Sequence, residues 1–259
     1  EVAAIDIAKG LAITCVLLIH AEPLAGTSVH EYVIDRAVPV LLVLFGAASQ
    51  LWWRRVPEQA SLLRAGLAFV RARYSRLLPQ VWAALGVWWG LRAVATWPGV
   101  HERLPDPKWL LPHALGYLPQ IGTGWFVTLV VQLVLLFPLL RWLLMRCGTL
   151  PTVLLALALH VTCQLRILDL VDLMRTALQD SAHVHGFFAF YYAWIFAPAR
   201  LLLLLAGMLL AALDMRLSAR LLQVCAVTWA TGCLVHTRLE DPIQRSLLLS
   251  LLDLPLALL

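Results

Sequence analysis

The chain contains no asparagine among its 259 residues, and only 14% of them are charged. An average soluble domain carries roughly 25% charged residues. Without asparagine the chain has no acceptor for N-linked glycosylation. The low charge, combined with a hydrophobic content of 61%, excludes an intrinsically disordered chain and an ordinary soluble enzyme.

Cysteine is also sparse. The five cysteines are scattered, form no C-x-x-C pair, and lie mostly in apolar runs. We interpret them as small buried residues rather than as disulfide or metal-site residues. No metal site is predicted.

Long apolar runs recur along the whole chain, whose mean hydropathy is +0.82. A membrane-spanning helix needs about 20 mostly apolar residues. The sequence therefore predicts an all-α, polytopic transmembrane bundle of about eight spans, forming a single integral-membrane domain over residues 1–259. The expected spans are 3–21, 32–53, 77–97, 123–145, 150–168, 186–213 with a kink at Pro198, 219–237, and one that begins near 243. A proline-broken stretch at 109–119 is expected to be re-entrant or interfacial.

Basic residues are concentrated on one side of this predicted topology. The loop expected at 54–76 carries six arginines against Glu58 alone. By the positive-inside rule this side and the N-terminus are cytoplasmic. The net charge of +5 is thereby interpreted as a topology signal, and no nucleic-acid partner is predicted.

The first expected span carries two residues that could perform chemistry. Lys9 and His20 are eleven residues apart, which places them on one helix face roughly 16 Å apart along the axis. Asp6 falls near the same face. Two interpretations of Lys9 stay open: it reaches the cytoplasmic surface paired with Asp6, or it serves a site together with His20.

A cluster of three arginines, Arg71, Arg73 and Arg76, precedes the span expected at 77–97. It is either a topology signal or a binding site for a phosphorylated cytosolic molecule, because the planar guanidinium matches phosphate geometry. Arg200 lies inside the span expected at 186–213, where an arginine is a functional-site hypothesis by default.

The segments IDIAKGLAI…LIHA, at the start of the chain, and RYSRLLP, with Arg73 and Arg76, resemble the acyltransferase family 3 membrane proteins. That family opens with a basic residue, usually Arg, and a His at the spacing of Lys9 and His20. The segment GTGWFVTLVVQLVLLFPLL, with Trp125, is similar to the family's Trp-Phe entry into a later helix. Members usually have ten spans, so the resemblance implies that the C-terminus is incomplete.

The resemblance implies an enzyme, an acyltransferase that moves an acyl group, expected to be acetyl, from cytosolic acyl-CoA to a carbohydrate hydroxyl. The acceptor would be an extracytoplasmic or lipid-linked sugar, so that the activity is O-acetylation of a cell-envelope polysaccharide in a bacterial inner membrane. His20 and Lys9 would be catalytic, and Arg71, Arg73 and Arg76 would bind acyl-CoA. Acyl-CoA is then a donor substrate, and no permanently bound cofactor is expected.

Arg200, Asp6 and Trp125 are candidates for a further polar site within the membrane. Two other functions stay open at this point. One is a membrane N-acetyltransferase of the heparan-glucosaminide type, which has a broadly similar first helix. The other is a non-enzymatic transporter or flippase of a polar glycolipid, for which intramembrane Lys9 and Arg200 would also be suitable.

Overall fold

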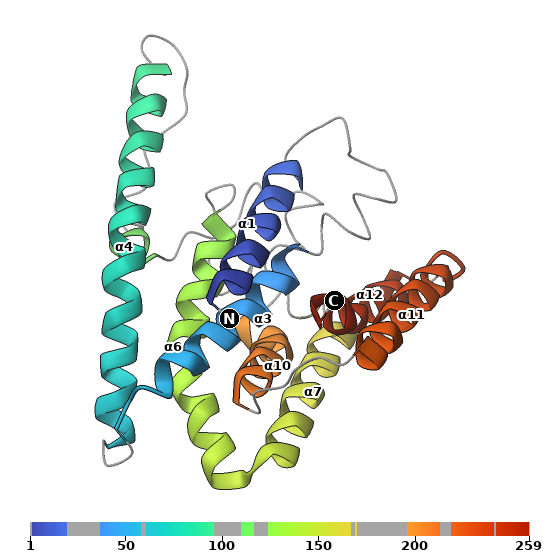
Figure 1. Ribbon diagram of the computed structural model, residues 1–259. Helices are drawn as coiled ribbons and strands as arrows, with labels where there is room; N and C mark the ends of the chain where they lie inside the picture. Colours follow the sequence, from blue (N-terminus) through green and yellow to red (C-terminus); the bar gives the residue numbers. More distant parts are fainter. Residues whose placement is uncertain are drawn as a thin grey trace. The chain divides into compact units, whose positions relative to one another are not determined.

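The computed structural model describes residues 2–19, 37–57, 61–95, 110–116, 124–166, 169, 196–212, 219–240 and 242–258. Within these ranges the secondary structure is helical and contains no β-strand (Figure 1). The all-α fold class is thereby confirmed. The chain divides into two compact units, which are described in turn.

The first unit comprises residues 1–57, 149–166 and 198–259. Its α-helices are α1 (Val2–Ile19), α3 (Ala37–Trp53), α7 (Thr149–Leu165), α10 (Leu201–Ala212), α11 (Ala219–His236) and α12 (Pro242–Leu258). A short 3-10 turn, η4 (Ala197–Arg200), leads directly into α10.

The central contact of this unit is between α3 and α10. Two glycines allow it. A Cβ on Gly207 would collide with the carbonyl oxygen of Val43, and a Cβ on Gly46 would collide with that of Leu204. Small residues that let two backbones approach this closely are typical of helix contacts in membranes.

The second unit comprises residues 58–148 and 167–197. Its helices are α4 (Leu62–Ala95), α5 (Leu110–Ala114) and α6 (Gly124–Cys147). α4 and α6 pack together and run in opposite directions (Figure 1). Gly66, near the start of α4, faces Pro138 in the second half of α6, whereas Val81 and Leu85 pack with Val127 near the start of α6.

Several predicted helices have the expected bounds to within a few residues. The ranges 123–145, 150–168 and 219–237 correspond to α6, α7 and α11. Pro198 lies in the 3-10 turn that precedes α10, and the part of the expected span 186–213 before residue 196 lies outside the described residues, so the kink stays a prediction. Of the stretch 109–119 the structure describes residues 110–116, which contain the five-residue α5.

One expected boundary is wrong. The arginine-rich segment expected as a loop is helical from Leu62 onward, and α4 continues through Pro79 to Ala95. Leucine, alanine and arginine are strong helix formers, so this segment is helical despite its charge. The arginines are therefore on a helix and have defined relative positions.

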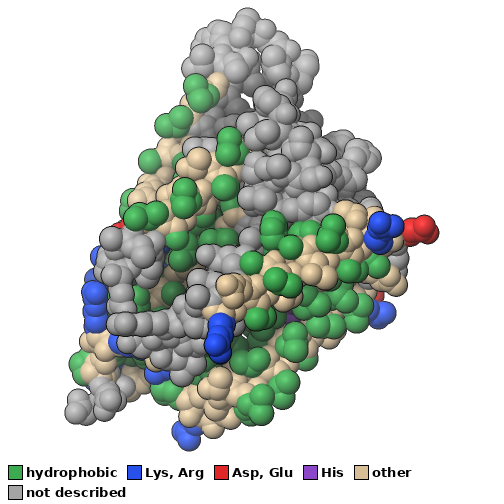
Figure 2. All heavy atoms as spheres, turned by 45° about the vertical axis from the view of Figure 1, so that its right-hand side comes forward, with side chains coloured by type: hydrophobic (Ala, Val, Ile, Leu, Met, Phe, Trp, Pro, Cys, Tyr) green, Lys and Arg blue, Asp and Glu red, His purple; other side chains and the backbone are tan. Residues whose placement is uncertain are grey.

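One helix among the described residues is long and apolar enough to cross a bilayer, namely the 22 residues Phe126–Cys147 of α6. Three shorter apolar helices cover Ala37–Trp53, Thr149–Leu165 and Ala197–Ala212. Hydrophobic side chains cover much of the described surface in Figure 2. The number of about eight spans stays a prediction.

Candidate functional site

The basic segment of α4 is anchored to α6 by an aromatic stack. Phe69 and Phe137 are both fully buried, and their ring centroids are 4.5 Å apart with the rings 26° from parallel. The guanidinium carbon of Arg73 lies 5.3 Å from the centroid of the Phe69 ring. A cation over an aromatic face is attracted by the ring quadrupole. The stack therefore holds Arg73 at the α4–α6 contact.

The three predicted donor-binding arginines have different environments. Arg73 is half-buried, whereas Arg71 and Arg76 are exposed. Burial, and then the positive charge of Arg76, lower the pKa of Arg73 from the ordinary value of an arginine. Both causes destabilise the charged form, and an anion bound between Arg73 and Arg76 would offset them.

Lys9 and Asp6 form an ion pair on α1. Lys9 Nζ donates to Asp6 Oδ1 at 3.4 Å, and the two side chains are 39% and 64% exposed. A pair this exposed contributes little to stability. The pairing agrees with the first of the two interpretations of Lys9. The expected catalytic partner, His20, lies outside the described residues, and so does the side chain of Trp125 in the first turn of α6.

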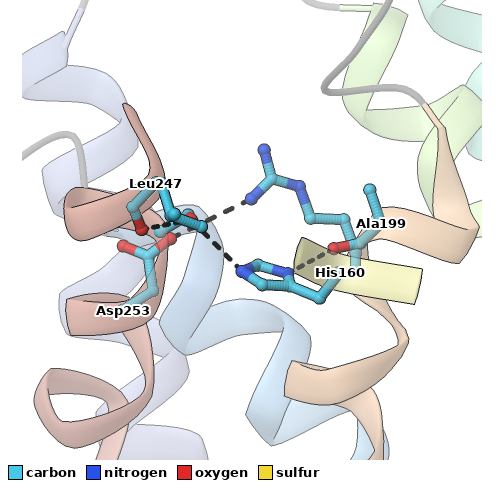
Figure 3. A network of polar contacts seen from close by, with 6 residues as sticks. His160, Ala199, Leu247 and Asp253 are labelled. Atoms are coloured by element: carbon cyan, nitrogen blue, oxygen red, sulfur yellow. Dashed lines mark hydrogen bonds and ion pairs between the residues drawn. The ribbon is translucent and has the colours of Figure 1, made fainter. Parts of the chain in front are cut away.

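A second group of polar side chains is buried within the first unit (Figure 3). It contains His160 of α7, Arg200 of η4, and Ser250 and Asp253 of α12, none more than 9% exposed. Arg200 Nη1 lies 3.9 Å from Asp253 Oδ2. Arg200 thus has Asp253 as an ion-pair partner, whereas Asp6, which was expected at the same polar site as Arg200, pairs with Lys9.

His160 is hydrogen-bonded through both ring nitrogens. Its Nδ1 is 2.7 Å from the carbonyl oxygen of Ala199, and its Nε2 is 3.2 Å from Ser250 Oγ. Since a carbonyl can only accept, Nδ1 carries the proton. The Ser250 hydroxyl also lies 2.8 Å from the carbonyl oxygen of Leu247, so its single proton is shared between two acceptors when the imidazole is neutral. His160 is thus a satisfied interior histidine.

Sequence reasoning missed Ser250 and Asp253. Asp253 is a lone carboxylate in the apolar run at the end of the chain, and that isolation is the signal that could have marked it. Its partners Arg200 and His160 are distant in sequence and come together only through helix packing. Among the described residues no group of three or more His, Cys, Asp or Glu side chains could hold a metal ion.

The described structure defines an all-helical protein with much apolar surface, a basic helix segment and an interior polar cluster. The chain belongs to acyltransferase family 3, because the model of that family, described as an acyltransferase domain, matches residues 2–236. The chain is thus a membrane acyltransferase in the general sense of that family. Neither the search of curated proteins nor the search of solved structures found a significant match.

Proposed function

We propose that this protein transfers an acyl group, acetyl in the simplest case, from cytosolic acyl-CoA to a hydroxyl group of a carbohydrate or glycolipid acceptor on the far side of the membrane. The membrane would be a bacterial inner membrane, with the N-terminus of the chain in the cytoplasm. Family membership supports acyl transfer in general. The observation that carries the donor assignment is the half-buried Arg73 beside the exposed Arg76 on one helical turn of α4.

The reaction conserves atoms and charge without an external redox partner. The acceptor oxygen attacks the thioester carbonyl carbon, the carbon–sulfur bond breaks, and the proton of the hydroxyl ends on the CoA thiol. His20 is proposed as the general base that removes this proton, because an imidazole titrates near neutral pH. Lys9, on the same face of the first helix, is proposed to assist it electrostatically.

Arg71, Arg73 and Arg76 are proposed to bind the phosphates of acyl-CoA. Residues three apart on a helix are neighbours on its surface, so Arg73 and Arg76 can contact one phosphorylated group together. Arg71, two residues before Arg73, adds further positive charge to this segment. If these arginines served membrane topology alone, Arg→Lys changes would leave acyl-CoA binding unchanged, because topology depends on charge and tolerates lysine in place of arginine.

The test uses the full chain purified in a neutral detergent with radiolabelled acetyl-CoA. Arg73→Lys and Arg76→Lys should each weaken acetyl-CoA binding by roughly ten- to a hundredfold, as expected for loss of one charge-assisted hydrogen bond. Arg220→Lys, which changes an exposed arginine of α11 in the first unit, is the matched control and should bind normally.

His20→Ala should bind acetyl-CoA normally and lose acyl transfer. A purified wild-type chain that neither binds acetyl-CoA nor releases CoA in the presence of bacterial envelope glycolipids would contradict the proposed function. Unchanged affinity in the double Arg→Lys variant would leave these arginines as topology signals only.

A further inference from the structure

A second half-buried arginine lies on the partner helix of the α4–α6 pair. Arg141 of α6 is half-buried, and its buried Nε has no hydrogen-bond partner among the described residues. The other arginine of α6, Arg146, is exposed. A buried guanidinium nitrogen without a partner is costly, and an anionic ligand would supply the missing acceptor.

The antiparallel packing places Arg141 at the same end of the helix pair as the basic segment of α4. Phe69 stacks on Phe137, Arg73 lies four residues beyond Phe69, and Arg141 lies four residues beyond Phe137 in the opposite direction. At 1.5 Å per residue the two arginine Cα atoms are about 12 Å apart along the pair. Because the Arg73 guanidinium lies over the Phe69 ring, it is displaced from the Arg73 Cα toward Arg141.

Neither helix supplies a carboxylate to neutralise this charge. α4 and α6 contain seven arginines and no aspartate or glutamate. Six of the seven arginines lie in the first half of α4 or the second half of α6, which the antiparallel packing brings to one end. The charge at this end therefore favours a ligand with more than one anionic group.

We infer that Arg141 binds the 3′-phosphate of the acyl-CoA adenosine while Arg73 and Arg76 bind the diphosphate. This inference rests on the proposed function. In CoA the diphosphate lies between the thioester arm and the adenosine, so the 3′-phosphate is the anionic group farther from the reacting carbonyl. Arg73 and Arg76 directly precede the part of α4 that is expected to span the membrane, residues 77–97. Arg141 of α6 is level with the start of α4, which is farther from that span. The order of the arginines along the helix pair thus matches the order of the phosphates along CoA.

The test compares acetyl-CoA with acetyl-3′-dephospho-CoA, which lacks only the 3′-phosphate. Both ligands are titrated against the purified full chain in neutral detergent without anionic lipid. Arg141→Gln should weaken acetyl-CoA binding by roughly tenfold or more and leave binding of the dephospho ligand unchanged. Arg146→Gln is the matched control, since it removes an exposed arginine from the same end of the same helix, and any change should be small and equal for the two ligands.

Arg73→Lys should weaken binding of both ligands equally, because the diphosphate is present in each. Equal weakening of both ligands by Arg141→Gln would overturn the inference, since it would mean that Arg141 acts through folding or another anion. No effect on either ligand would also overturn it while leaving the Arg73 and Arg76 site intact. Should Arg141→Gln lose monodispersity, Arg141→Lys is measured against the same two ligands, with selective loss for acetyl-CoA again expected. A wild-type chain that binds neither ligand contradicts the proposed function itself.

Discussion

Removal of Asp253 should destabilise the first unit far more than removal of an exposed carboxylate. Asp253 is 2% exposed and lies 3.9 Å from the guanidinium of Arg200, which is 9% exposed. In Asp253→Leu the positive charge of Arg200 stays buried without its carboxylate. Breaking a buried ion pair by removing one partner costs about 3–5 kcal/mol.

The distance of 3.9 Å is long for a direct ion pair, so we expect a loss near the lower limit, about 3 kcal/mol. For a chain of this size each 1 kcal/mol lowers the melting temperature by roughly 2–4 °C. The expected fall is therefore roughly 6–12 °C. The measurement is thermal unfolding of the purified chain in detergent, followed by intrinsic fluorescence of its 11 tryptophans.

The control is Asp6→Leu, because Asp6 belongs to the exposed pair with Lys9. An exposed pair is worth about 0–1 kcal/mol, so this variant should melt within a few degrees of the wild type. The double variant Arg200→Met with Asp253→Leu should recover most of the loss, since a buried pair replaced by apolar side chains is often neutral. Equal falls in melting temperature for Asp253→Leu and Asp6→Leu would refute the reasoning. So would a double variant whose fall equals the sum of the falls measured for Arg200→Met alone and Asp253→Leu alone.

Three further outcomes are expected. Gly148 follows α6 with φ at 85° and open space around it, so Gly148→Ala should cost about 1–2 kcal/mol through backbone strain alone, measured as a fall in melting temperature. Gly207→Ala should lower the yield of folded protein in size-exclusion chromatography, because its Cβ meets the Val43 backbone, whereas Gly10→Ala, whose Cβ meets no described atom within 4 Å, should behave as the wild type. A cysteine introduced at Ser181 should react with a membrane-impermeant reagent only from outside, as the expected topology requires, and labelling only from the cytoplasm would invert that topology.

Helix positions were largely predictable from the sequence, because hydropathy and proline mark where apolar helices begin and end. The limits of α6, α7 and α11 follow these signals closely. The helical start of α4 at Leu62 is not marked by hydropathy, because the arginines of this segment make it polar, whereas the helix propensity of its leucines, alanines and arginines is high. Local propensity decided the structure there.

The interior polar cluster could be predicted only in part. Arg200 stands out in the sequence because a charge in an apolar run is exceptional. Ser250 is 90 residues from its partner His160, and no periodicity within one helix relates the two. Pairings between distant helices depend on tertiary packing, which a single sequence does not specify.

The distribution of side chains around α7 bears on the solvent that surrounds the first unit. The buried stripe of this helix contains Thr152, His160 and Gln164, all at most 4% exposed. Its outward face carries Leu150 and Leu154, which are 68% and 55% exposed. A surface helix of a water-soluble protein shows the reverse arrangement, with its apolar stripe toward the core and its polar face outward.

Such an inverted helix is unfavourable in water, since each leucine left exposed forgoes roughly 1.5–3 kcal/mol of burial. In hydrocarbon the same leucines are solvated without cost, and polar side chains are stable only where they meet one another inside the bundle. The hydrogen bonds of His160 to Ala199 and Ser250, and the pairing of Arg200 with Asp253, meet that requirement. The burial pattern of α7 thus favours a lipid environment on grounds independent of hydropathy, and it gives the interior cluster a physical reason: these groups pair with one another because the outer face of the helix offers them no water.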